Sequence, residues 1–294
     1  MRRTVWITLL LTLLPVACGG YPKYVPFSTV DSDPDWSPDG RIIAFTSSRD
    51  DGSTGIYVIR PDGHGLRRLF NGTAKEVDWS PDGDRIAFVG ADGIYVMRRD
   101  GGSPVRILRG GQFSLPAWAP DGHRLGVVKD DQDLKTAIYV VRLDGSGLRR
   151  LLSPSRAGST IATSETEPAW SSDGRQIAFQ SGDGRIVAVR IADGRRRQIA
   201  REGFTPAWSP NGRLIAFQCG PAAVLCAANA DGTGDIRRLA SAGGNPSWSP
   251  DARRVVFDVY HSRGHFRTQA RSLSVVDVDG GGVQKVTYGP APPG

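Results

Sequence analysis

One short phrase recurs six times along this chain: a tryptophan, a small residue, Pro, Asp and Gly. The copies read WSPDG, WSPDG, WAPDG, WSSDG, WSPNG and WSPDA, and they begin at Trp36, Trp79, Trp118, Trp170, Trp208 and Trp248. Successive tryptophans are 43, 39, 52, 38 and 40 residues apart. A repeat of about 40 residues with β-rich filling is typical of small sheets arranged radially, one sheet for each repeat. The repeat therefore constrains the architecture, and function has to be sought where the repeats differ.

Each repeat contains the same elements in the same order. The tryptophan phrase is followed by a β-rich run such as 42–45, a second run such as 56–60, an Asp-Gly turn such as 62–63, and a short last strand such as 67–69. The runs are β-branched and aromatic, and Gly, Pro and Asp bound them. We therefore expect an all-β fold, a six-bladed β-propeller with four antiparallel strands per blade. The tryptophans should wedge between neighbouring blades in a structural role.

The phrases WSPDG, IAF, IYV and DG, in this order, resemble the WD-repeat-like units of TolB-type β-propellers. That family is found in bacterial envelope proteins and in the propeller of prolyl-oligopeptidase-like enzymes. The resemblance covers about residues 23–288 and is specific for the fold, but the same blade serves many functions. Six blades leave no room for a second domain, and no G-x-S-x-G nucleophile elbow is present.

The first 18 residues have the pattern of a signal peptide. Two arginines precede an apolar run that is too short to span a membrane, and Val16-Ala17-Cys18-Gly19 resembles a lipobox, although Pro15 stands where Leu is usual. We expect Cys18 to be the lipid anchor of a protein attached to the bacterial cell envelope, periplasmic or on the outer face of the membrane. Ordinary cleavage to a secreted protein is the alternative. The expected domains are the leader 1–18, a propeller 19–288 and a tail 289–294.

The formal net charge is +7, and arginines cluster on the last, outermost strand of the blades. Such charges protect sheet edges against aggregation, and contact with anionic lipid or envelope polymers is the alternative. An exported protein with no aromatic and basic platform is not expected to bind nucleic acid. We expect a monomer.

Two cysteines beyond the leader, Cys219 and Cys226, flank the turn of one hairpin. In an oxidising compartment they are expected to form a local disulfide. Two buried thiols acting as small apolar residues are the alternative.

The repeats differ mainly on one side of the expected propeller. The WSPDG and DG turns share one side, here called the regular face, and the variable hairpins and blade-to-blade links share the other, the irregular face. Variable loops on a rigid scaffold often carry function. Three residues before each tryptophan, where the innermost strands ring the channel, stand Asp33, Glu76, Leu115, Glu167, Thr205 and Asn245. Glu165 lies close by, and Phe113 and Phe204 interrupt the acidic arc.

These residues predict an acidic mouth at the irregular face. The candidate partner-binding residues are Asp33, Glu76, Phe113, Glu165, Glu167 and Phe204. Such a mouth would dock a basic segment of an envelope protein or peptide, although solvated carboxylates at loop ends would give the same pattern. No cofactor or metal site is expected; carboxylate oxygens would suit an axial calcium ion, but no loop has a recognised calcium-binding spacing.

We therefore predict a membrane-anchored binding module rather than an enzyme. The alternative is a propeller enzyme, of the lactonase or sugar-dehydrogenase kind, with a metal or cofactor on the axis. The axial residues contain no convergent histidine and no clear nucleophile and base pair, so the sequence predicts no catalytic residue.

Overall fold

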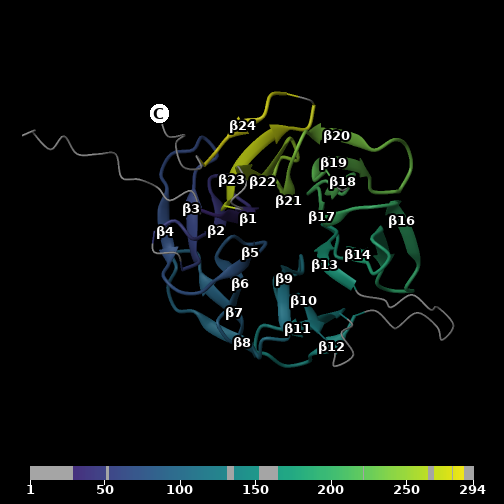
Figure 1. Ribbon diagram of the computed structural model, residues 1–294. Coiled ribbons are helices and arrows are strands. Elements are labelled where there is room, and N and C mark those ends of the chain that lie inside the picture. The colour runs from purple at the N-terminus through teal and green to yellow at the C-terminus, as the bar shows by residue number, and fades with distance from the viewer. Residues whose placement is uncertain are drawn as a thin grey trace, which may run out of the picture.

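The computed structural model contains six four-stranded antiparallel sheets arranged in a ring (Figure 1). It describes residues 29–50, 53–130, 136–151, 165–220, 222–263, 268–279 and 281–287. Each sheet is formed by one sequence repeat, and every regular element in the described ranges is a strand. The predicted six-bladed β-propeller is confirmed.

The first three blades follow one another along the chain. Blade 1 contains β1 (Asp31–Trp36), β2 (Ile43–Ser47), β3 (Gly55–Ile59) and β4 (Arg67–Phe70). Blade 2 contains β5 (Lys75–Trp79), β6 (Arg85–Gly90), β7 (Gly93–Arg98) and β8 (Val105–Arg109). Blade 3 contains β9 (Phe113–Trp118), β10 (Arg124–Asp130), β11 (Thr136–Arg142) and β12 (Arg149–Arg150).

The second half of the chain repeats this organisation. Blade 4 contains β13 (Glu165–Trp170), β14 (Gln176–Ser181), β15 (Ile186–Arg190) and β16 (Arg196–Ala200). Blade 5 contains β17 (Phe204–Trp208), β18 (Leu214–Cys219), β19 (Val224–Asn229) and β20 (Arg237–Ala240). Blade 6 contains β21 (Gly244–Trp248), β22 (Arg254–Arg263), β23 (Thr268–Asp277) and β24 (Gln284–Lys285).

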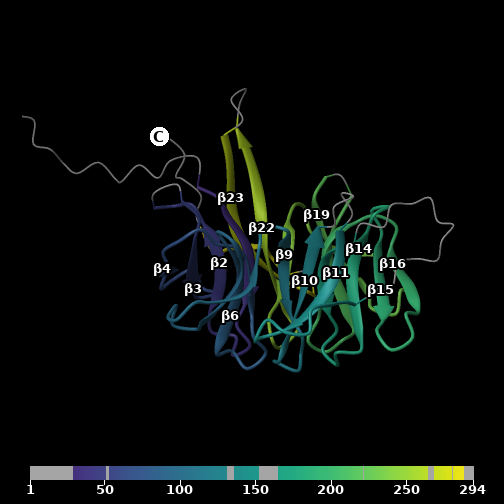
Figure 2. The same ribbon diagram turned by 90° about the horizontal axis from the view of Figure 1, so that it is seen from below.

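The first strand of every blade lies next to the central axis, and the fourth lies at the rim (Figure 1). Each first strand ends at the tryptophan of its repeat, so the WSPDG turns all lie at one end of the ring. At the other end the long β22–β23 hairpin projects beyond the neighbouring blades (Figure 2). The two faces thus differ as the sequence predicts, with short uniform turns on one and variable hairpins on the other.

The WSPDG turn is held by its own side chains. In blade 1 the Ser37 hydroxyl donates to Asp39 Oδ1 at 2.7 Å, and the same oxygen accepts the Arg41 N–H at 3.1 Å. Gly40 follows with φ 72°, a left-handed conformation that glycine adopts without steric cost. Asn211 takes the place of the aspartate in blade 5 and accepts the equivalent bonds. The turn therefore survives where its sequence departs from the repeat.

Apolar side chains fill the spaces between adjacent blades. In the cluster that joins blades 6 and 1, Trp36 and Phe45 pack with Val256, Leu273 and Val275. All six repeat tryptophans are at most 9% exposed, as expected for residues wedged between sheets. Burial of this apolar surface is the main favourable contribution to folding.

Blade 6 closes the ring with an outer strand of its own. β24 pairs with β23, so residues 284–285 form the fourth strand of that blade. Val30 forms a parallel bridge with Arg271 further along β23, and the earlier segment 23–27 lies outside the described residues. All four strands of blade 6 come from the end of the chain. Blade 6 is joined to blade 1 by side-chain contacts and by a backbone bond, in which the Arg271 N–H donates to the Thr29 carbonyl at 3.2 Å.

Candidate binding site on the propeller axis

Every innermost strand contains a bulge three residues before its tryptophan. The backbone there takes φ values between 47° and 59°, in the left-handed region, at Asp33, Glu76, Leu115, Glu167, Thr205 and Asn245. The strand register shifts at the same place, for example between Ser32 and Asp35 in blade 1. These are the six positions that the sequence placed around the channel, and all six line one axial cavity. We call them the bulge ring.

Hydrogen bonds around the bulge ring connect one blade to the next. The backbone N–H of Leu115 donates to Glu76 Oε2 at 2.6 Å, and that of Thr205 donates to Glu167 Oε2. The N–H of Asn245 donates to Thr205 Oγ1 at 3.2 Å. A left-handed residue in a strand leaves its N–H outside the ladder, so a side chain of the preceding blade satisfies it.

Asn245 closes the bulge ring between the last blade and the first. Its Nδ2 donates to Asp33 Oδ1 at 3.1 Å and to Asp258 Oδ2 at 2.9 Å. Asp258 also accepts a bond from Arg271 at 3.1 Å. Asp33 is thereby fixed beside the axis by a partner more than 200 residues away in the sequence.

A second tier lies directly before the tryptophans. Asp35 Oδ2 accepts the N–H of Trp79 at 2.6 Å, and Asp78 Oδ2 accepts the N–H of Trp118 at 2.5 Å. Ser247 takes the same position in blade 6; its Oγ accepts the Trp36 N–H at 3.1 Å and donates to Asp35 at 2.7 Å. Alanines occupy this position in the other three blades. The sequence analysis did not single out this tier; counting one residue back from each tryptophan would have found it.

The two tiers enclose a cavity of about 560 Å³. Among the described residues that line it are five carboxylates and no lysine, arginine or histidine; the carboxylates belong to Asp33, Asp35, Glu76, Asp78 and Glu167. The remaining wall is apolar and includes all six repeat tryptophans. The lining extends from the bulge ring to Pro38, Pro81, Pro120 and Pro210 of the WSPDG turns. The cavity therefore lies toward the regular face, whereas the sequence placed the acidic mouth on the irregular face.

Burial raises the pKa of four of the carboxyl groups in this cavity, those of Asp35, Glu76, Asp78 and Glu167. Burial raises the pKa of Asp35 to about 6, against hydrogen bonds from Trp79 and Ser247 that lower it. Burial and the neighbouring Asp35 charge raise the pKa of Asp78 well above its ordinary value. Burial also raises the pKa of Glu76, with contributions from the charges of Asp33 and Glu167. The axis is a place where negative charge is concentrated and incompletely hydrated, so a cation there would be attracted.

Two acidic groups near the irregular face are already paired. Asp31 is fully buried, and the guanidinium of Arg49 donates to both of its carboxylate oxygens at 2.7 and 2.6 Å. Asp258 is paired with Arg271. These ion pairs neutralise two carboxylates near the irregular face.

Of the other predicted partner-binding residues, Phe113 and Phe204 are not among the described residues that line the cavity. Phe113 is 5% exposed and packs between blades 2 and 3 with Ile94 and Trp118. Phe204 begins β17 and is 41% exposed. Glu165 begins β13, and its side chain lies outside what the structure describes.

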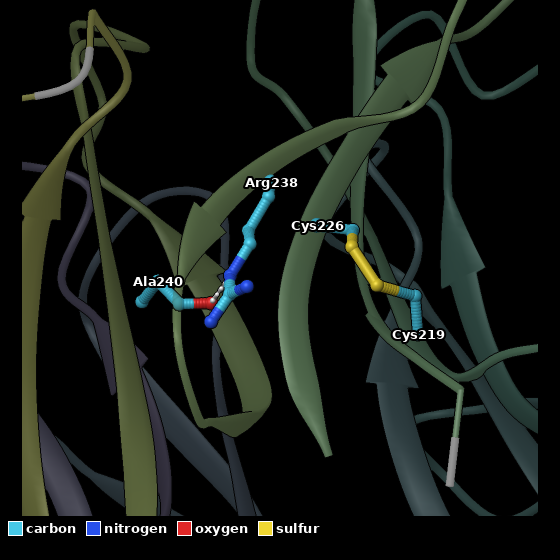
Figure 3. Close-up of a disulfide and its surroundings, with 4 residues drawn as sticks. All are labelled: Cys219, Cys226, Arg238 and Ala240. Carbon is cyan, nitrogen blue, oxygen red and sulfur yellow. Dashed lines mark hydrogen bonds between the residues drawn. A yellow bond between two sulfur atoms is a disulfide. The ribbon is translucent and has the colours of Figure 1, made fainter. Parts of the chain in front are cut away.

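The two cysteines of blade 5 are bonded to each other (Figure 3). The Cα atoms of Cys219 and Cys226 are 5.9 Å apart, and the two residues lie diagonally across the β18–β19 hairpin, since Cys219 pairs with Val224 and Cys226 with Phe217. Arg238 lies across from Cys226 on β20 and donates to the Ala240 carbonyl (Figure 3). The other predicted covalent site, Cys18, lies outside the described residues.

Within the described ranges, no cluster of three or more His, Cys, Asp or Glu side chains has an arrangement that could hold a metal ion. The same part of the chain contains no helix long and apolar enough to cross a membrane.

Six blades around an acidic axial pocket define the class of protein, a six-bladed β-propeller with a polar site in its channel. The family described as PD40, TolB beta propeller domain, matches residues 108–291, and the chain belongs to this family. This confirms the resemblance that the repeats carry.

Solved structures of similar fold include two TolB proteins. The structure assigned to TolB from Agrobacterium tumefaciens is 19% identical, with a TM-score of 0.61, 76% of this chain covered and 84% of the other. TolB from Acinetobacter baumannii is 18% identical, with a TM-score of 0.64, 87% of this chain covered and 65% of the other. An oligogalacturonate lyase in complex with manganese is 13% identical, with a TM-score of 0.57, 86% of this chain covered and 91% of the other. At these identities the likeness shows the fold alone. No curated protein matches the sequence significantly.

Proposed function

We propose that this protein is an exported, membrane-anchored binding module that docks a basic segment of a protein or peptide partner in its axial pocket. The observation that carries the proposal is the composition of the cavity lining, five carboxylates with no basic side chain, in a chain whose net charge is +7. A cationic side chain entering the pocket would gain favourable Coulomb energy in surroundings that screen charge less than water.

The size and walls of the cavity suit a short peptide segment. A volume of about 560 Å³ falls in the ordinary range of small-ligand sites, so it accepts a few side chains and not a folded domain. The tryptophan and proline surfaces between the carboxylates can pack against the methylene stems of lysine or arginine. The partner would therefore insert a basic loop or tail along the axis.

The proposed anchor is consistent with this direction of approach. Thr29, the first described residue, leads into the end of β1 that lies opposite the WSPDG turns. A lipid on Cys18, which ten residues (19–28) separate from Thr29, would hold the irregular face toward the membrane. The regular face, toward which the acidic cavity extends, would then remain accessible to a partner in the envelope.

The test compares the wild type with a variant that neutralises the bulge ring, Asp33→Asn with Glu76→Gln and Glu167→Gln. The amides keep an oxygen that can accept the inter-blade N–H bonds, so the fold should persist while three charges are lost. Fluorescence anisotropy with lysine- and arginine-rich peptides measures the affinity. We expect binding to the wild type at low salt, weakened at least about tenfold in the variant.

A matched control removes three carboxylates from the same face but away from the axis. Asp84→Asn, Asp235→Asn and Asp279→Asn change exposed residues that do not line the cavity. Equal peptide affinity for both triple variants would mean that net charge, not the axial pocket, governs binding, and the proposal would fail. Capture from detergent-solubilised native membranes with the same variants then identifies the natural partner.

The alternative function is a propeller enzyme with an axial metal or cofactor. The observation in its favour is the acidic axis on a fold shared with a lyase that was solved with manganese. Thermal unfolding with calcium or manganese separates the two functions. A rise in melting temperature that the bulge-ring variant abolishes would support the enzyme and count against the peptide-binding module.

A further inference from the structure

A second cavity, of about 280 Å³, lies at the rim of blade 4, far along the sheet from the axial pocket. Its lining consists of Gln176, Ala188, Arg190, Arg195, Arg196 and Arg197. These residues come from the start of β14, from β15 and its end, and from the turn into β16. The cavity therefore lies at the end of the blade where the Asp-Gly turns are, on the regular face.

The strand register explains why the side chains converge. Gln176 pairs with Arg190 across β14 and β15, and Ala188 pairs with Arg197 across β15 and β16. Directly paired residues share a sheet face, as do residues two apart in one strand, so these four side chains project to the same side. In blades 1 and 3 the residue paired with the equivalent arginine is a valine, Val58 or Val140. The smaller Ala188 leaves space beneath the guanidinium groups of blade 4.

Arg197 is held in place as the floor of this cavity. Its Nη2 donates to Gln176 Oε1 at 2.9 Å and to the carbonyl of Ala230, in blade 5, at 2.7 Å. Its Nε is buried and has no hydrogen-bond partner in the described part of the chain. Because the bonds from Nη2 fix the guanidinium group, Arg197 needs little further ordering to present its positive charge to an acceptor in the cavity.

The positive charge at this cavity exceeds the negative charge beside it. Arg190 donates to Asp193 at 3.1 Å through one nitrogen and is half-exposed. Arg195 is exposed and has no ion pair or hydrogen bond from its side chain to any described residue. The other nearby carboxylate, Asp231, has its pKa lowered by hydrogen bonds from Thr233 and also by the charge of Arg197. The guanidinium groups of Arg190, Arg195 and Arg197 thus belong to a concave site with one directly paired aspartate. The fourth arginine of the lining, Arg196, has its guanidinium over the Phe179 ring.

We propose that this cavity, here called the blade 4 arginine site, binds an oxyanion of the phosphate class. Guanidinium forks match the tetrahedral oxygens of phosphate, with several charge-assisted hydrogen bonds to one group. A concave site of this size suits a single phosphate-sized group, since cavities for drug-sized ligands are generally larger. The phosphate can belong to a soluble molecule or to a lipid headgroup, and the chemistry recognised is the same. A headgroup would have to lie in a membrane that meets the regular face, and not in the one that the proposed Cys18 anchor would hold at the irregular face.

The experiment uses the full chain without its leader, and inorganic phosphate is the probe. Isothermal titration calorimetry at low ionic strength measures phosphate binding. The pocket variant is Arg190→Gln with Arg195→Gln, because both side chains are exposed and neither joins blade 4 to blade 5. The control variant is Arg237→Gln with Arg238→Gln, two arginines at the start of the outer strand of the neighbouring blade. Both variants lose two positive charges. Urea unfolding confirms that each remains folded.

We expect phosphate to bind the wild type and the control variant alike and to bind the pocket variant at least about tenfold more weakly. Equal affinity in the two variants, or no phosphate binding by the wild type, would overturn the proposal. Vesicles of phosphatidylglycerol mixed with phosphatidylcholine then identify the source. Loss of vesicle binding only in the pocket variant indicates a lipid headgroup, whereas unchanged vesicle behaviour with lost phosphate binding indicates a soluble phosphate compound.

Discussion

Replacing Asp35 with asparagine should change how the stability of this propeller depends on pH. Asp35 lies in the second tier of the axial pocket, and its pKa is raised from 3.8 to about 6 by burial. A carboxyl group whose pKa is raised by folding stabilises the native state while it is protonated. That contribution is present below pH 3.8 and is lost as the pH rises through about 6. A change in pKa of this size corresponds to at most about 3 kcal/mol in the free energy of unfolding, and hydration of Asp35 by water in the pocket makes the contribution smaller.

Asparagine does not titrate, so the variant should gain stability over the wild type as the pH rises. Its amide can still accept the Trp79 N–H and donate to Ser247, which keeps the fixed cost of the change small. Removing the Asp35 charge also relieves Asp78, whose pKa it helps to raise, and this acts in the same direction. Urea unfolding followed by tryptophan fluorescence at pH 4, 6 and 8 gives the free energies. We expect the difference between variant and wild type to grow by about 1–3 kcal/mol from pH 4 to pH 8.

The matched control is Asp173→Asn, in the WSSDG turn of blade 4. Hydrogen bonds from the Ser171 hydroxyl and the Arg175 N–H lower the pKa of Asp173, so its contribution is present above its ordinary pKa and is lost as the pH falls. This variant should lose stability relative to the wild type at pH 8 and approach it at low pH, the opposite sign to Asp35→Asn. Parallel pH profiles for Asp35→Asn and the wild type would refute the reasoning, because they would mean that water hydrates the axial carboxylates fully.

Four further predictions concern the ring and its covalent sites. Ser247→Ala should lower the free energy of unfolding by about 1–3 kcal/mol in urea titrations, because the Trp36 N–H and the Asp35 carboxylate each lose a hydrogen-bond partner. Ala252 has φ 57° at a position where the other turns have glycine, so Ala252→Gly should raise the free energy of unfolding by up to about 1 kcal/mol. Gly212→Ala, at φ 69°, should lower the free energy of unfolding in the same assay. Cys18→Ser should release the protein from membranes into the soluble fraction, and persistent anchoring would refute lipidation. Mass spectrometry of the unreduced protein should find the blade 5 disulfide, and two alkylated thiols would refute it.

The fold could be predicted from the sequence because six copies of one phrase specify the same local structure. A turn that holds itself together through Ser, Asp and Gly needs no information from distant residues, and the structure has it in the altered copies too. Ring closure was not predictable in the same way. Residues 284–285 form the outer strand of blade 6, but the contact with blade 1 depends on side chains more than 200 residues apart, such as Asn245 and Asp33.

The candidate site was partly predictable. Counting three residues back from each tryptophan gave the bulge ring, because the repeat fixes that distance in every blade. Phe113 stands five residues before Trp118, not three, and its side chain packs in the blade interface. Asp31, five residues before Trp36, is buried as well. Side chains alternate along a strand, and a bulge shifts the alternation, so nearness to the axis in sequence does not place a residue in the channel.

The bulge ring connects stability to function in this propeller. A left-handed conformation is costly for a residue with a Cβ, and Leu115 and Thr205 adopt it without the local hydrogen bonding that helps Asn or Asp. At Leu115, Thr205 and Asn245 the conformation turns the N–H toward an acceptor on the preceding blade, so bonds that hold the blades in register offset the strain. The acceptors at Glu76 and Glu167 are carboxylates, and an uncharged acceptor such as Thr205 accepts the same kind of bond. Structural need therefore explains an acceptor at these positions but not an ionisable one. Burial raises the pKa of both carboxyl groups, and a bound basic partner would favour their charged form.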